Sequence, residues 1–159
     1  MKLILRIIII GILINFLLLA TASKTDAATA KQDLPCQQWH SALRKAGLPV
    51  EIFAPIMWRE SRCTPQAIGW NYKKGKSEKD CRLSHASTYR YCKAVKSYDT
   101  GLLQINSTWV TLTKTTCKAK DMLILQKPWC NLKVAAVLWN GGKGVSHWRA
   151  TSNATIGKK

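Results

Sequence analysis

Apolar residues recur at helical spacing between residues 35 and 60, in two segments that each begin near a proline. The spacing predicts two consecutive helices, over residues 35–47 and 49–60, whose inward faces carry Trp39, Leu43 and Ala46 in the first and Val50, Phe53, Ala54, Met57 and Trp58 in the second. Pro55 interrupts the second pattern, because a proline inside a helix removes one backbone hydrogen bond. We therefore expect a kink at Pro55, or a helix that starts later than its apolar pattern.

The C-terminal half of the chain carries two further helical patterns, over residues 107–120 and 128–139. Pro128 suits a helix start, Gly141-Gly142 suits the end, and the inward stripe consists of Leu132, Ala135, Ala136 and Trp139. Residues 69–98 are instead polar, basic and aromatic, so any strands there should be short. The chain thus predicts a mainly α, or α+β, fold in which a small helical domain carries a short irregular or β excursion.

The first 30 residues have the pattern of an export signal. Lys2 and Arg6 give a positive start, an apolar run follows over residues 7–20, and small residues at 20–22 and 28–30 would suit a signal peptidase. The apolar run comes near the about 20 residues that span a bilayer but falls short of them, so an uncleaved membrane anchor is the alternative. Either way we expect an exported protein, in the periplasm, the cell wall or the extracellular space.

The rest of the chain has room for one domain, over residues 35–150, followed by a small and polar tail over residues 151–159 that we expect to be flexible. All six cysteines lie in this domain, and an even number in a short exported chain predicts disulfides. Sequence alone allows 15 connectivities. Nearness along the chain favours Cys81 with Cys92 and Cys117 with Cys130, which leaves Cys36 with Cys63.

The spacing of the cysteines and histidines does not favour the alternative to disulfides, which is a metal site. The sequence has no pair of cysteines separated by two residues, and His40, His85 and His147 are scattered without the spacing of metal ligands. We therefore expect neither a metal nor another cofactor.

The chain is strongly basic, with 25 lysine and arginine residues against 8 acidic ones and a formal net charge of +17. Such a surface accelerates encounter with polyanions and holds the protein on them, in a way that salt screens. Nucleic acid, an anionic membrane and an acidic cell-wall polymer all fit the charge. Export disfavours nucleic acid.

Few acidic side chains follow the export segment, namely Asp33, Glu51, Glu60, Glu78, Asp80, Asp99 and Asp121. Glu60 stands out, because it ends an apolar helix, where burial can raise the pKa of a carboxylic acid enough to let it donate a proton near neutral pH. A proton donor of this kind is needed to cleave a glycosidic bond. The alternative is that Glu60 pairs with Arg59 or Arg62, which would hold its pKa down.

Asp99 is the second candidate, since it stands two residues before Gly101 at the entry to a largely apolar segment. In glycosidases a second carboxylate lies about 5 to 5.5 Å from the acid when it is a nucleophile and about 6.5 to 9.5 Å away when it is a base. The alternative is that Asp99 caps a turn formed with Thr100-Gly101.

Four separated segments together resemble the lytic transglycosylase and goose-type lysozyme family: Glu60-Ser61, Pro65-Gln66-Ala67, Gly101-Leu102-Leu103-Gln104-Ile105 and Trp139-Asn140-Gly141-Gly142. Compared with the family pattern, Leu103 replaces a methionine, and Trp139 and Gly141 replace a tyrosine and an alanine. The resemblance implies a small helical lysozyme-like fold, a peptidoglycan glycan strand as substrate and Glu60 as the catalytic acid.

Residues 97–109 also resemble the segment of animal-type lysozymes that carries their second catalytic aspartate, and Asp99 falls at that position. In lytic transglycosylases a single glutamate acts as acid and then as base, and the 6-hydroxyl of the sugar replaces water, which leaves an anhydro end. A functional Asp99 would instead favour hydrolysis, so the sequence leaves both outcomes open.

The resemblance also implies residues that contact the substrate. Ser61 would orient the substrate or the acid, Gln104 and Asn106 would offer side-chain hydrogen bonds to sugar groups, and Trp139 with Asn140 would face the glycan strand.

Together these features predict an exported, monomeric glycosidase that acts on the β-1,4 bond between MurNAc and GlcNAc, with added electrostatic attraction to an anionic wall polymer or membrane. The alternative is a cationic wall- or membrane-binding protein on an inactive lysozyme-like scaffold, in which the basic segment 70–98 does the binding.

Overall fold

The computed structural model describes residues 33–83 and 91–148, and the predicted export segment and tail lie outside them. The chain divides into two units, Met1–Asp33 and Leu34–Lys159, of which the second contains nearly all the described residues. Among the helices of the described part, none is long and apolar enough to cross a membrane.

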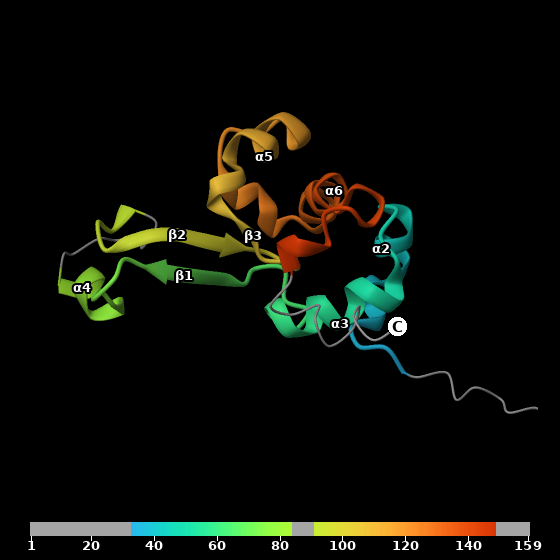
Figure 1. Cartoon of the computed structure of the whole chain (residues 1–159), viewed down its shortest axis with the longest axis horizontal. Helices are drawn as coiled ribbons and strands as arrows, with labels where there is room; N and C mark the ends of the chain where they lie inside the picture. The colour runs from blue at the N-terminus through green and yellow to red at the C-terminus, as the bar shows by residue number, and fades with distance from the viewer. Residues whose placement is uncertain (1–32, 84–90, 149–159) are drawn as a thin grey trace, which may run out of the picture. The chain divides into compact units, whose positions relative to one another are not determined.

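The second unit is mainly helical, as predicted, with one small antiparallel sheet (Figure 1). Its helices and strands are, in chain order, α2 (His40–Lys45), α3 (Val50–Ser61), β1 (Ile68–Tyr72), α4 (Glu78–Leu83), β2 (Val95–Thr100), β3 (Ile105–Asn106), α5 (Val110–Cys117) and α6 (Pro128–Trp139). Short 3₁₀ turns precede α2 and α5, separate α5 from α6, and follow α6.

Helix α3 begins at Val50 and continues through Pro55, so the expectation of a later start is wrong. Pro55 is the sixth residue of the helix, and its missing N–H removes only the bond to the carbonyl of Glu51, an exposed residue of the first turn. The cost is offset by burial, because Phe53, Ala54, Ile56 and Met57 are fully buried.

The sheet has the order β1-β2-β3 and is antiparallel throughout. Asp99 on β2 lies opposite Gly69 on β1 and Asn106 on β3. Farther along, Asn71 pairs with Ser97 and Tyr72 with Val95, which leaves Lys96 as the extra residue of a bulge. The predicted excursion therefore contains strands of five and six residues, and these are antiparallel partners.

One apolar core holds the helices together, and we call this part, residues 34–67 and 101–148, the helical body. Its largest fully buried side chains include Leu43, Phe53, Ile56, Met57, Leu102, Leu103, Leu125 and Val134. The disulfides Cys36–Cys63 and Cys117–Cys130 lie in this core, which confirms their predicted pairing.

The described residues 69–83 and 91–98 form what we call the arm, which leads away from the helical body and has α4 at its far end (Figure 1). The arm has a small apolar cluster of its own, formed by Cys81, Cys92 and Ala94 with Tyr72 and Val95 against them. The disulfide Cys81–Cys92 lies in this cluster, as predicted.

Candidate active site

Glu60 is the penultimate residue of α3 and is half-buried. The helix ends at Ser61, and the next residue, Arg62, adopts a left-handed conformation with φ 52°. The guanidinium of Arg62 lies 4.8 Å from the centre of the Trp58 ring and donates to the Trp58 carbonyl. Of the two arginines proposed as alternative partners of Glu60, Arg62 is therefore directed to Trp58.

Ser61, the next residue, ties this helix end to the segment that follows β2. Its side chain is buried, and its hydroxyl lies 2.8 Å from the carbonyl oxygen of Leu102 and 3.2 Å from that of Met57, both within hydrogen-bonding distance. Because Leu102 is three residues beyond Asp99, this bond brings the backbone of Glu60 near the end of β2.

The segment after β2 is fixed by a glycine and a buried asparagine. Gly101 has φ +83°, and its N–H donates to the Ala67 carbonyl over 2.8 Å. Asn131 on α6 is fully buried and accepts from the Leu103 N–H while its amide nitrogen donates to the carbonyls of Thr100 and Leu125. A Cβ on Gly101 would overlap both the Leu125 carbonyl and the Asn131 side chain.

Gln104 uses its side-chain amide inside this turn. Its Nε2 donates to the carbonyl of Gly101 over 2.9 Å and to that of Ala67 over 3.2 Å. Its Oε1 lies so close to Gly69 that a Cβ there would be 2.9 Å away. The half-buried Gln104 side chain therefore connects the start of β1 with the turn that follows β2.

Asp99 is held by two amide side chains across the sheet. The Asn71 Nδ2 donates to one carboxylate oxygen over 2.7 Å, and the Asn106 Nδ2 donates to the other over 2.8 Å. Within the described residues, these side-chain contacts replace the predicted capping of the Thr100-Gly101 turn, so that alternative is wrong. The carboxylate has a fixed orientation on the face of the sheet shared with Asn71 and Asn106.

Ser97 completes this polar network, because Asn71 and Asn106 both donate to its hydroxyl oxygen, over 3.2 and 3.3 Å. Asn106 also accepts from the Thr108 N–H and so caps the turn before α5. Our sequence analysis included Asn106 but missed Asn71 and Ser97. The alternation of a strand, which places residues 97 and 99 on one face, could have found Ser97.

Trp139 and Asn140 lie at the C-terminal end of α6. The Trp139 ring meets the Phe53 ring of α3 edge-on with centroids 5.1 Å apart. Gly142 lies near the Cζ2 and Cη2 atoms of the Trp139 ring. Asn140 is exposed and takes the left-handed conformation that ends the helix. Phe53 thus joins the end of α6 to the same helix that carries Glu60.

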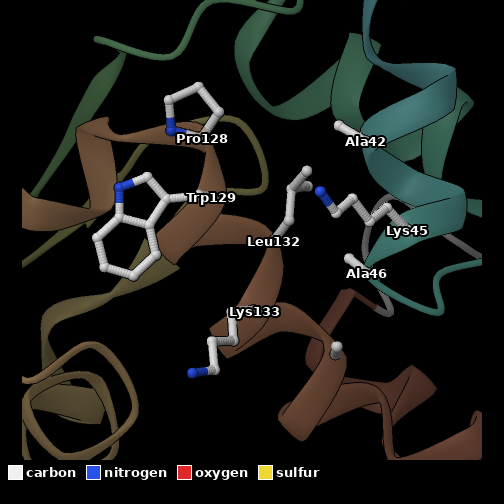
Figure 2. Close-up of a pocket in the computed structure, with 8 residues that line it drawn as sticks. Ala42, Lys45, Ala46, Pro128, Trp129, Leu132 and Lys133 are labelled. Carbon is white, nitrogen blue, oxygen red and sulfur yellow. The ribbon is translucent and has the colours of Figure 1, made fainter.

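A groove of about 740 Å³ lies elsewhere, between α2 and α6. Figure 2 shows Ala42 and Lys45 of α2, with Ala46 directly after the helix, on one side of it and Trp129 and Leu132 of α6 on the other. It shares no lining residue with the candidate site, and its walls are mostly apolar. The groove is therefore separate from the segments that carry Glu60 and Asp99.

Comparison with known proteins gives one clear result. No curated protein and no solved structure matches the chain significantly. A family model described as the transglycosylase SLT domain matches residues 37–151, which are 115 of the 159 residues. The chain therefore belongs to the transglycosylase SLT domain family, within the lysozyme-like superfamily.

Proposed function

We propose that this protein is an exported enzyme that cleaves the β-1,4 bond between MurNAc and GlcNAc, with Glu60 as the catalytic acid. Membership of the SLT family implies cleavage of peptidoglycan glycan strands and indicates lytic transglycosylase activity. The observation that carries the assignment to Glu60 is the Ser61–Leu102 bond, which ties the end of α3 to the segment beside Asp99.

Glu60 would act twice in this mechanism. Its protonated carboxyl donates to the glycosidic oxygen as that bond breaks, and the sugar at the cut develops oxocarbenium character. The ionised carboxylate then removes the proton of the 6-hydroxyl of the same sugar, whose oxygen attacks C1. Glu60 is protonated again, and the product ends in a 1,6-anhydro sugar.

Asp99 would stabilise the positive charge of this transition state. An ionised carboxylate that is already oriented needs no reorganisation when charge develops, which makes such a group effective. The two amide hydrogen bonds from Asn71 and Asn106 support this role, since they fix both carboxylate oxygens. With the family match favouring the lytic outcome, we assign Asp99 to charge stabilisation rather than to activation of water.

The remaining site residues divide into positioning and binding groups. The hydroxyl of Ser61 and the amide of Gln104 hydrogen-bond to backbone carbonyls, which supports a positioning role for both. Asn140 is exposed and Trp139 half-exposed beside α3, which supports sugar contact. Asn106 would position Asp99 rather than bind sugar directly.

The cellular setting follows from two observations. Three disulfides form and persist in oxidising compartments outside the cytosol, and the SLT domain acts on the cell wall. Both fit an exported protein that works at the wall.

A cationic wall-binding protein without activity is the second candidate, favoured by the exposed lysines of the arm. It predicts that Glu60 can be replaced without any loss of function. Replacing the Glu60 carboxyl group therefore distinguishes the two proposed functions.

The test is the release of soluble fragments from purified peptidoglycan by the disulfide-bonded protein and three single variants. We expect Glu60→Gln to lower kcat by about 10²–10⁴-fold, because the proton donor is lost. Asp99→Asn should lower it less, by about a hundredfold, because only charge stabilisation is lost.

Glu51→Gln is the matched control, since Glu51 is an exposed glutamate in the first turn of the same helix. It should leave kcat unchanged, and thermal melts should show all variants folded. Activity that survives in Glu60→Gln would refute the assignment, and peptidoglycan binding with no cleavage by the unaltered protein would support the inactive scaffold.

A further inference from the structure

The arm concentrates exposed positive charge. The sequence over residues 69–98 holds eight lysine or arginine residues and two acidic ones. The described lysines are all exposed, namely Lys73, Lys74, Lys76, Lys79, Lys93 and Lys96. One of the two acids, Asp80, is already paired with Lys76 over 3.2 Å. The arm therefore presents a net positive surface to solvent.

The arm is held in shape by interactions of its own. The cluster around Cys81 and Cys92 is separate from the core of the helical body. The Lys73 N–H donates to the Ala94 carbonyl, and Asp80 accepts from the Ser77 N–H at the start of α4. A cationic surface on a fixed support loses less entropy on binding than one on a mobile loop.

The arm is also continuous with the site, because one strand belongs to both. Strand β2 carries Asp99 near one end and begins at Val95, beside Lys93 and Lys96. At a rise of about 3.3 Å per residue, Lys96 lies about 10 Å from Asp99 along the strand, and Lys93 lies in the turn just before the strand begins. A glycan strand bound at Asp99 would thus reach the arm's lysines if it extended along the sheet toward Val95.

The exposed lysines and their position next to β2 favour a ligand that carries negative charge and belongs to the same polymer as the glycan strand. The sugar chain of peptidoglycan is uncharged at its backbone, whereas its peptide stems carry free carboxylates, and these stems are part of the same polymer. Lysine ammonium groups bind carboxylates through charge-assisted hydrogen bonds. An anionic lipid surface would satisfy the charge as well, but nothing would place it next to Asp99.

We propose that the arm binds the carboxylates of the peptide stems, so that the enzyme selects glycan strands that carry peptides over bare ones. This inference rests on the proposed function, since it places the scissile strand at Asp99. The arm would then determine which part of the wall is cut, while Glu60 does the cutting.

The experiment compares soluble, uncross-linked glycan strands that carry their stems with the same strands after an amidase has removed the stems. Four arm lysines are replaced together, as Lys73→Gln, Lys74→Gln, Lys93→Gln and Lys96→Gln. At low salt we expect this variant to raise KM for the peptide-bearing strands by about tenfold. Its kcat on bare strands should equal that of the unaltered protein.

A matched variant removes the same charge from the helical body, as Lys45→Gln, Lys118→Gln, Lys127→Gln and Lys133→Gln, all at exposed positions. It should keep the preference for peptide-bearing strands. An equal loss of preference in both variants would overturn the proposal, because overall charge and not the arm would then be responsible. Thermal melts establish that both variants fold.

Two further outcomes are distinguishable. If the unaltered protein cleaves neither kind of strand, the proposed function fails; if it cleaves both equally and the arm variant matches it, only the arm proposal fails. Sedimentation with phosphatidylglycerol vesicles tests the lipid alternative. Vesicle binding that depends on the arm lysines, with strand preference intact, would overturn the stem assignment.

Discussion

The helical body and the arm are stabilised in different ways. The body buries one continuous apolar core, in which many large side chains are completely inaccessible. The arm buries a cluster of three residues around one disulfide and exposes its lysines. Glu60 belongs to the body, and Asp99 stands where the arm joins it. The proposed acid therefore stands on the part with the larger core, whereas the part with the exposed charge is available for recognition.

The largest loss of stability should come from adding a methyl group at Gly101, where the arm joins the helical body. We expect Gly101→Ala to cost about 4 kcal/mol or more of unfolding free energy, because an alanine is strained at φ +83° and its Cβ would overlap Leu125 and Asn131. Urea denaturation measures the loss. The site should be lost with the fold.

Gly75 in the arm offers a matched control. It has a similar φ of +73°, but a Cβ there would meet nothing within 4 Å. Gly75→Ala should therefore cost only about 1 kcal/mol, from the backbone alone. Equal costs at the two positions would contradict the close packing that we describe around Gly101.

Removing one disulfide from the helical body or one from the arm should also have different effects. Cys36–Cys63 spans 27 residues and Cys81–Cys92 spans 11, so loop entropy gives about 3.5 and about 2.8 kcal/mol for the two. We expect the double serine variant of the first pair to lower the global melting temperature. The same change in the arm should mainly expose arm amides to hydrogen exchange and leave cleavage of bare strands intact.

A loss of cleavage of bare strands in the Cys81 and Cys92 variant would show that the arm also holds the reacting groups. That result would contradict the division of roles between body and arm.

The smallest expected effect is a pH dependence confined to the arm. The hydrogen bond from the Ser77 N–H, with help from Lys76, lowers the pKa of Asp80 below its ordinary value of 3.8. A lowered pKa in the folded state means that the contribution to stability is present above pH 3.8 and is lost as the pH falls through the lower value. Below that pH, the Ser77 amide should exchange faster, as NMR can measure.

Asp80→Asn should abolish this acid transition, whereas amides of α3 should not respond to it. If the exchange rate of the Ser77 amide showed no such acid transition, Asp80 would not contribute to the stability of the arm.

Much of the helical body was predictable because its helices carry clear start signals. The pattern over residues 128–139 matches α6, where Pro128 is at the N-terminus. Asp121 accepts from the Leu123 N–H and caps the 3₁₀ turn before α6. The pairings of all three disulfides followed from nearness along the chain.

Other features depend on contacts between distant residues. The segment over residues 107–120 ends early, at Cys117, because Lys118 takes a left-handed conformation without a glycine to signal it. Asn131 is fully buried, and two of its three backbone partners, Thr100 and Leu103, lie 31 and 28 residues away along the chain, so its local sequence does not predict them. Asn71 reaches Asp99 only through the pairing of β1 with β2.

The central claim is that Glu60, supported by Asp99, cleaves the strand by a lytic reaction. Mass spectrometry of fragments released from purified peptidoglycan tests it most directly, with the disulfide-bonded protein from about Lys31 onward. We expect 1,6-anhydro ends that disappear in Glu60→Gln. Reducing ends that depend on Glu60, each heavier by one water, would contradict the lytic mechanism and make Asp99 a hydrolytic partner instead.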